Sequence, residues 1–184
     1  GAELWKRLVD EGILTTGDNY EIMDSLFKEG KAAMIINGPW AVKAYKDAGI
    51  DYGVALIPDL EEGLPAKPFV GVQGFMINAK SPNKVLARDF LVNFIATKDT
   101  MHKIYLADPR LPSREDVLSL VEDDPDIVGF TQSAANGTPM PNVMEMAAVW
   151  GAMNDALNLI INGKASPEDA LINAVETIKA QIGK

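Results

Sequence analysis

The spacing of apolar residues along the chain predicts mainly amphipathic helices. Apolar positions recur every three or four residues in most segments, with polar residues between them. Glycine follows many of these segments, and serine with proline precedes others, as is typical of helix ends and starts. The predicted helices run from Ala2 to Gly12, Tyr20 to Gly30, Trp40 to Gly49, Pro82 to Ile95, Asp99 to Leu106, Ser113 to Glu122, Val143 to Ile161 and Ser166 to Ile178.

Short apolar runs rich in β-branched residues predict strands at residues 33–36 and 52–57. Together with the helix between them, these strands predict a parallel, right-handed βαβ crossover. A third extended run covers residues 69–77 and is interrupted by Gly71 and Gly74. Because glycines weaken a strand and permit a bend, we place a domain boundary in this run.

The turn Asn37-Gly38-Pro39-Trp40 joins the first predicted strand to its helix. Asn37 or Gly38 can cap this helix, and Pro39 suits its first turn, where a missing N–H costs nothing. Trp40 is then presented beyond the carboxyl end of a strand, where α/β proteins bind ligands. The other interpretation is a core residue that closes the base of the helix, and the local pattern leaves both open.

Tyr20 and Trp150 also have two interpretations each. Tyr20 begins a predicted helix beside a loop, where its ring can staple the helix or stack on a ligand. Trp150 lies in the middle of a predicted helix, in an apolar stripe that is more typical of a core than of a binding site. This stripe consists of Met146, Val149, Trp150, Met153 and Leu157.

Residues 81–125 contain predicted helices but no predicted strand, so they require a sheet supplied from elsewhere. One face of the helix from Pro82 is strongly apolar, and we expect the isolated chain to self-associate through it or to rearrange it against its other parts. This face carries Val85, Leu86, Phe90, Leu91, Phe94 and Ile95.

Composition excludes several classes of function. The 184 residues suffice for one or two domains with a substantial core. A net charge of -9, without clusters of lysine and arginine, argues against nucleic acid as a partner. The absence of cysteine excludes disulfides, thiol catalysis and cysteine-bound zinc. No segment approaches the apolar length that a membrane span needs.

Catalytic motifs are equally scarce. The chain has no nucleotide-binding, serine-hydrolase, zinc-protease or EF-hand motif. The single histidine, His102, lacks a second histidine as a ligand partner, which favours a solvated surface residue. The carboxylates are scattered, and their separation in space, which a glycosidase pair requires, cannot be read from sequence. We therefore expect no catalytic residue, no metal site and no cofactor.

The order of motifs resembles the carboxyl-terminal half of bacterial maltose/maltodextrin-binding proteins, which are extracytoplasmic receptors of ABC sugar importers. The resemblance covers essentially the whole chain and is strongest to the proteins of thermophilic bacteria. It rests on five motifs in order: residues 33–40, Tyr52-Gly53-Val54, residues 67–72, residues 77–84, and Met140-Pro141-Asn142 followed by Trp150.

The resemblance implies an α/β architecture of type II periplasmic-binding-protein fold, with two lobes and a hinge. The chain is then a helix-rich fragment that begins inside a larger protein and lacks its amino-terminal half. Residues 1–68 and 127–184 belong to the carboxyl-terminal lobe, and residues 74–119 to the amino-terminal lobe. Residues 69–73 and 120–126 are the hinge crossings.

The resemblance also implies site residues. Trp40 and Trp150 match the two tryptophans on which family members stack sugar rings, and Tyr20 and Met140 match further ligand-binding positions. Pro39 and Asn154 are weaker candidates. Gly151 stands where the family has an aromatic residue, and Asn154 where it has an arginine, so the preferred sugar length stays open.

The expected function is therefore non-enzymatic binding of maltodextrin, with maltotriose as the expected ligand, in the periplasm or another extracytoplasmic location. The expected partners are the membrane subunits of an ABC transporter and the amino-terminal half of the receptor. Two alternatives remain, a carbohydrate-active enzyme of the glycosidase type and a fragment that binds nothing by itself.

Overall fold

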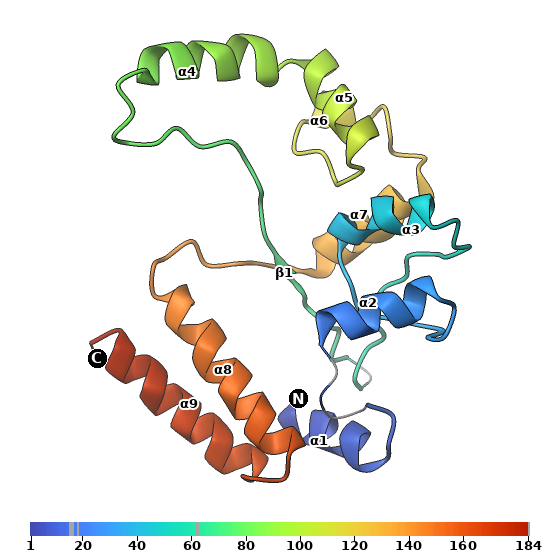
Figure 1. The fold of residues 1–184 in the computed structure, drawn as a ribbon, viewed down its shortest axis with the longest axis vertical. Helices are drawn as coiled ribbons and strands as arrows, with labels where there is room; N and C mark the ends of the chain where they lie inside the picture. Colours follow the sequence, from blue (N-terminus) through green and yellow to red (C-terminus); the bar gives the residue numbers. More distant parts are fainter. Residues whose placement is uncertain (15–16, 18, 62, 184) are drawn as a thin grey trace. The chain divides into compact units, whose positions relative to one another are not determined.

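The computed structural model describes residues 1–14, 17, 19–61 and 63–183 of the chain. They belong to two compact units, and Figure 1 labels the α-helices and β1. The first unit comprises Gly1–Met23 and Pro141–Lys184, and the second comprises Asp24–Met140.

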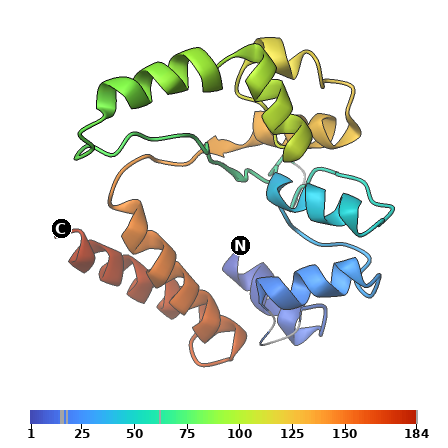
Figure 2. The same cartoon turned by 45° about the horizontal axis from the view of Figure 1, so that its top comes forward.

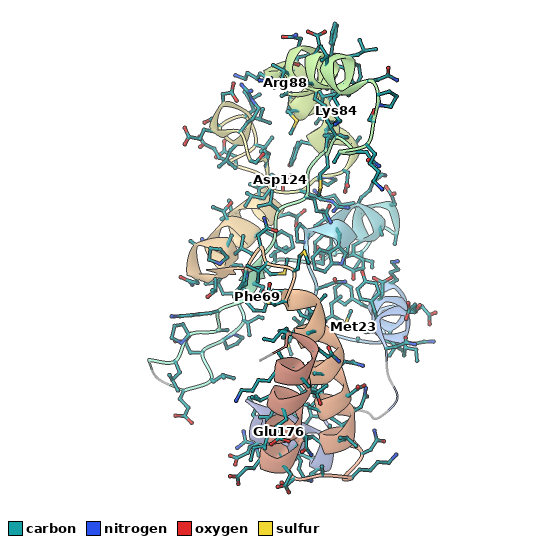
Figure 3. The ribbon with its side chains drawn as sticks, turned by 90° about the vertical axis from the view of Figure 1, so that its left-hand side faces the viewer. Met23, Phe69, Lys84, Arg88, Asp124 and Glu176 are labelled. Carbon is teal, nitrogen blue, oxygen red and sulfur yellow. The ribbon has the colours of Figure 1, made fainter. Side chains whose placement is uncertain are left out.

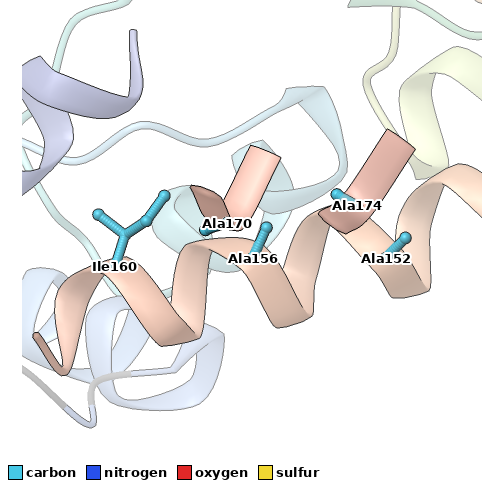
Figure 4. Packing of buried hydrophobic residues seen from close by; sticks show 5 residues of the cluster. All are labelled: Ala152, Ala156, Ile160, Ala170 and Ala174. Carbon is cyan, nitrogen blue, oxygen red and sulfur yellow. The ribbon is translucent and has the colours of Figure 1, made fainter. Parts of the chain in front are cut away.

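Three helices build the first unit, namely α1 (Ala2–Asp10), α8 (Met146–Ile161) and α9 (Pro167–Gln181). Helices α8 and α9 lie side by side, joined by a short turn, and α1 contacts both (Figure 1). Their core is small and rich in alanine, which lets the backbones of α8 and α9 approach closely (Figure 4). The core residues are Ala152, Ala156, Ile160, Ala170 and Ala174.

The start of α9 follows from its sequence, as predicted. Ser166 is the N-cap, its Oγ accepts a hydrogen bond of 3.0 Å from the backbone N of Asp169, and Pro167 occupies the first turn. Gly163, with φ of +64°, allows the chain to turn after α8.

The predicted core stripe of α8 is confirmed only in part, because Met146, Val149, Met153 and Leu157 are half-buried but Trp150 is not buried. Trp150 is 52% exposed, whereas Ala152, Ala156 and Ile160 face α9 and are buried. Nearly every side chain of α8 is apolar, so periodicity alone could not show which face would meet a partner. The small alanines face α9 because they permit the closer contact.

Helices are the main regular elements of the second unit, and α2 contains the boundary between the units. One buried cluster of this unit joins Tyr105, Val121 and Ile127. The helices are α2 (Tyr20–Lys28), the 3-10 turn η1 (Pro39–Ala41), α3 (Val42–Asp47), α4 (Lys84–Phe90), the π-helical η2 (Leu91–Ile95), α5 (Lys98–Ala107), α6 (Glu115–Leu118) and α7 (Pro125–Asn136).

The strands of the described residues are only two, β1 (Phe69–Val70) and β2 (Thr138–Pro139). They pair in parallel, with Phe69 opposite Thr138 and Val70 opposite Pro139. Gly137 allows this approach, because a Cβ atom there would lie 2.8 Å from the backbone O of Pro68.

The predicted strands at residues 33–36 and 52–57, and hence the βαβ crossover, are not formed, and the run 69–77 is a strand only at β1. A strand requires a neighbour that exchanges backbone hydrogen bonds with it, and no described segment pairs with these runs. Val54 instead packs against α7, where a Cβ atom at Gly129 would lie 2.6 Å from its Cγ1.

Several helix starts differ from prediction, and α8, for example, begins at Met146 and not at Val143. Pro82 does not open a helix, because α4 begins at Lys84 with Asn83 as its N-cap. Ser113 likewise does not cap α6, which follows Arg114. Helix α7 was not predicted at all, although Asp124 caps it and Pro125 occupies its first turn.

The apolar face of α4 and η2 is uncovered within the second unit. Figure 2 shows these two elements as one helical rod that leads into α5. Val85 is 86% exposed, and Phe90 and Phe94 are 52% and 59% exposed. The two phenylalanine rings stack on each other at 5.8 Å. Leu91 and Ile95 are half-buried.

Candidate functional site

The turn that carries Trp40 is fastened to two helices. Gly38 is the N-cap of η1, and its backbone N donates a hydrogen bond of 2.9 Å to Oδ1 of Asn37. Nδ2 of Asn37 donates to the hydroxyl of Tyr45 in α3 at 2.6 Å. That hydroxyl donates in turn to Oδ1 of Asp24 in α2 at 2.8 Å. The position of Trp40 is therefore tied to α2 and α3.

Trp40 is not a core residue of its unit. Its side chain is 53% exposed, whereas Ala41, Val42 and Tyr45 are buried. The indole lies back over Gly38, at a position where a Cβ atom on the glycine would lie 2.2 Å from Cζ3 of the ring. A flat, half-exposed ring of this kind offers an apolar surface to a ligand.

Met140 directly follows β2 and is held by the short ladder. Its backbone N donates to the carbonyl O of Val70 at 3.1 Å, and the N of Thr138 donates to the O of Pro68 at 2.9 Å. The side chain of Met140 is 40% exposed. Figure 3 shows the side chains of the molecule and labels Phe69 in β1.

The remaining candidates lie in the first unit. Trp150 and Asn154 stand one turn apart on the same face of α8, and both are exposed. Gly151 faces open space, with nothing within 4 Å of a Cβ atom placed there. Tyr20 begins α2 and is 47% exposed. Oδ1 of Asn19 caps this start by accepting from the N of Ile22 at 2.9 Å.

The structure thus brings Pro39 together with Trp40 in the second unit, and Trp150 together with Asn154 in the first. Met140 belongs to the second unit and Tyr20 to the first. All four principal candidates are at least 40% exposed. Their assignment to ligand binding stays a prediction.

We did not anticipate one polar cluster, which surrounds the start of α7. Asp124 accepts from the hydroxyl of Tyr105 at 2.8 Å, and Asp126 accepts from the hydroxyl of Tyr52 at 3.0 Å. Nζ of Lys46 lies 2.8 Å from Oδ2 of Asp126 and 3.5 Å from Oδ2 of Asp124. The Asp124-Pro125 dipeptide, a helix-start signal, was the only sequence feature that could have indicated it.

The cluster shifts the pKa values of its members. Burial and the hydrogen bond to Asp126 raise the pKa of Tyr52, and burial and the bond to Asp124 raise the pKa of Tyr105. Burial opposes ionisation of Asp124, but the bonds from Tyr105 and from the N of Asp126, with the charge of Lys46, lower its pKa. The hydrogen bond to Asp126 raises the pKa of Lys46, and this effect outweighs desolvation, which lowers it.

His102, which we predicted as a solvated residue, is half-buried. Its ring lies nearly parallel to that of Tyr105 in the same helix, at 6.5 Å between centroids. Part of the His102 side chain is therefore covered by the core residue Tyr105 and not by solvent.

Comparison with known proteins identifies the class. The profile of a family described as bacterial extracellular solute-binding protein matches residues 1–129. The chain therefore belongs to this family, which implies the periplasmic-binding-protein fold, and the resemblance to ABC-transporter binding proteins is confirmed.

Three relatives are similar over most of the chain. The galactooligosaccharide-binding protein of Bacillus subtilis is 36% identical over 99% of this chain. The maltotriose-binding protein of Pyrococcus abyssi is 34% identical over 85% of this chain and 35% of its own length. The maltooligosaccharide ABC transporter solute-binding lipoprotein of Streptococcus pneumoniae is 30% identical over 100% of this chain.

The chain spans only 44% of the length of the Bacillus and Streptococcus relatives. The helix-rich character of the described residues agrees with a part of a larger periplasmic-binding fold. All three relatives are named as binding proteins, and the Streptococcus protein as one of an ABC transporter, so the expectation of a non-enzymatic protein is confirmed and the glycosidase alternative has no support. Among the described residues, no helix combines the length and the apolar character needed to cross a bilayer.

Proposed function

We propose that this chain is part of an extracytoplasmic receptor that binds maltodextrin and delivers it to an ABC transporter. The observation that carries the proposal is similarity over nearly the whole chain to proteins named for maltooligosaccharides and maltotriose. The lipoprotein among these relatives supports a location outside the cytoplasm. The receptor's partners would be its sugar and the transporter's membrane subunits.

Trp40 and Trp150 are the proposed stacking surfaces. The C–H face of a glucose ring lies flat against an indole and removes apolar surface from water, while its hydroxyls need polar partners at the rim. Both indoles are about half exposed, at 53% and 52%, which suits this use. Tyr20 offers a ring with a hydroxyl, Met140 an adaptable apolar contact, and Asn154 an amide.

We also propose the two-lobe arrangement of a type II binding protein. Residues 1–68 and 127–184 form the carboxyl-terminal lobe, residues 74–119 belong to the other lobe, and residues 69–73 and 120–126 cross between them. In support, β1 falls in the first crossing and the N-cap of α7 in the second. The exposed face of α4 would then be covered by the rest of the receptor, whereas the isolated chain would self-associate through it or rearrange it against its other parts.

A second sugar class has a specific observation in its favour. The relative named for galactooligosaccharides is 36% identical, against 34% and 30% for the two maltose-type relatives above. Gly151 and Asn154 stand where the resemblance expects an aromatic residue and an arginine, so contacts to outer sugars can differ. Galactooligosaccharide is therefore the alternative ligand.

Calorimetry of the complete receptor with maltotriose and with galactotriose tests the proposal. We expect saturable binding of maltotriose, with the sugar recovered intact after incubation. Tighter binding of galactotriose would favour the alternative ligand, and binding of neither sugar would contradict the proposed function. The isolated chain is expected to bind either sugar very weakly or not at all, because it spans only 44% of the length of the Bacillus and Streptococcus relatives.

A further inference from the structure

Side chains from two other parts of the second unit hold residues 124–126, where α7 begins. Figure 3 labels Asp124 at the start of this helix. Asp124 and Asp126 are hydrogen-bonded to each other, because the backbone N of Asp126 donates to Oδ1 of Asp124 at 2.9 Å. Their other oxygens accept from residues that lie far away in the sequence.

Helix α5 holds the segment from one side. The hydroxyl of Tyr105 donates to Oδ2 of Asp124 at 2.8 Å, and its ring is only 8% exposed. The ring packs in the cluster with Val121 and Ile127, which flank the two aspartates in sequence. A buried phenol fixed by packing presents its hydroxyl in one direction, so this bond has little freedom to follow a moving partner.

Helix α3 and Tyr52, in the loop that follows this helix, hold the segment from the other side. Lys46 places its ammonium 2.8 Å from Asp126, and the hydroxyl of Tyr52 donates to the same carboxylate at 3.0 Å. Asp126 is only 7% exposed, which makes it the most buried charged residue among those described. A buried carboxylate that loses its partners is costly, so these contacts resist separation.

We propose that this cluster is a hinge clamp, which fastens the crossing at residues 120–126 to both lobes and limits how far they move at this crossing. The inference rests on the proposed function, under which Tyr105 belongs to one lobe and Lys46 and Tyr52 to the other. One short segment is bonded to both proposed lobes, through Asp124 to Tyr105 and through Asp126 to Lys46 and Tyr52. A change in the angle between the lobes at this crossing therefore strains at least one of these bonds. The clamp therefore narrows the range of unliganded conformations and lowers the entropy that sugar binding must remove.

Two matched substitutions test the clamp in the complete receptor. Tyr105→Phe and Tyr52→Phe each delete one hydroxyl that donates to one of the two aspartates. Tyr105→Phe removes the hydrogen bond that links α5 to Asp124, whereas after Tyr52→Phe the Lys46 ion pair still holds Asp126 from α3. Spin labels at Lys84→Cys in α4 and Glu176→Cys in α9, one in each proposed lobe, report the distance between lobes, and the chain contains no other cysteine.

We expect Tyr105→Phe to broaden the distance distribution without sugar and to weaken sugar affinity by about two- to fivefold. Tyr52→Phe should leave the distribution unchanged and only lower the melting temperature. An unchanged distribution in a folded Tyr105→Phe receptor, or equal broadening in both variants, would overturn the clamp.

The two proposals fail separately. If Tyr105→Phe broadens the distribution in a receptor that binds neither maltotriose nor galactotriose, the ligand assignment is wrong and the clamp stands. If the sugar binds and the distribution does not change, the clamp is wrong and the function stands.

Discussion

The indole of Trp40 lies directly over the backbone of Gly38, where a Cβ atom would come within 2.2 Å of Cζ3 and 2.3 Å of Cη2 of the ring. No real Cβ atom tolerates such distances, so any side chain at this position forces the indole away. The orientation of the proposed stacking surface therefore depends on a glycine two residues earlier.

Substitution Gly38→Ala in the complete receptor should displace the indole and weaken sugar binding by about three- to tenfold. Calorimetry measures the affinity. Gly53→Ala is the matched control, since nothing lies within 4 Å of a Cβ atom at Gly53, and it should leave the affinity unchanged. Wild-type affinity in folded Gly38→Ala would show that the observed ring orientation is not used in binding.

Substitution Trp40→Ala should weaken maltodextrin binding by several fold to a hundredfold, because one lost stacking surface is worth roughly 1–3 kcal/mol. Trp150→Ala should act in the same way. Since both indoles are about half exposed, at 53% and 52%, stability should fall only slightly, as a thermal melt will show. Trp5→Ala, at a tryptophan 42% exposed in α1, is the control that should not alter affinity. If all three variants bind alike, the stacking assignment is wrong.

The alanine core between α8 and α9 should not accept a larger residue. Ala156 is 2% exposed, so Ala156→Leu should lower the free energy of unfolding by about 1–3 kcal/mol, because extra methyl groups force the helices apart. Urea unfolding followed by circular dichroism measures this. Gly151→Ala, on the open face of the same helix, should instead raise stability by about 0.5–1 kcal/mol. A stabilising Ala156→Leu would contradict the close packing.

The hinge clamp should make stability depend on pH in the acid range. The pKa of Asp124 is lowered in the folded chain by Tyr105, by the N of Asp126 and by Lys46, so its ionised form stabilises the fold. That contribution is fully present above the ordinary aspartate pKa of about 3.9 and is lost as the pH falls through the lower, folded-state pKa.

Asp124→Asn should therefore destabilise the chain by about 1–3 kcal/mol at pH 7, and the difference from wild type should shrink as the pH falls below about 4. Urea unfolding across this pH range provides the measurement. Asp123→Asn changes the exposed neighbouring carboxylate and should have little effect at any pH. A destabilisation by Asp124→Asn that stays constant down to pH 3 would show that its charge is not the cause.

The sequence alone predicted most helices and the class of protein. Helix starts and ends depend on residues close in the chain, so Ser166 with Pro167, and the glycines with positive φ such as Gly30 and Gly49, were sufficient signals. The order of motifs around Trp40 and Met140 indicated the family because it extends over the whole chain. Helix α7 was missed although Asp124 and Pro125 carry the same kind of local signal.

Only the tertiary structure decided the features that depend on partners far away in sequence. Residues 33–36 and 52–57 have the composition of strands, but a strand exists only where another segment accepts its hydrogen bonds. The exposure of Trp150 depended on which face of an almost wholly apolar helix would meet α9. The contact between Tyr105 and Asp124 depended on how α5 packs beside α7. Local residue order determines where a helix begins and ends, whereas side-chain burial and polar contacts form only when distant segments pack together.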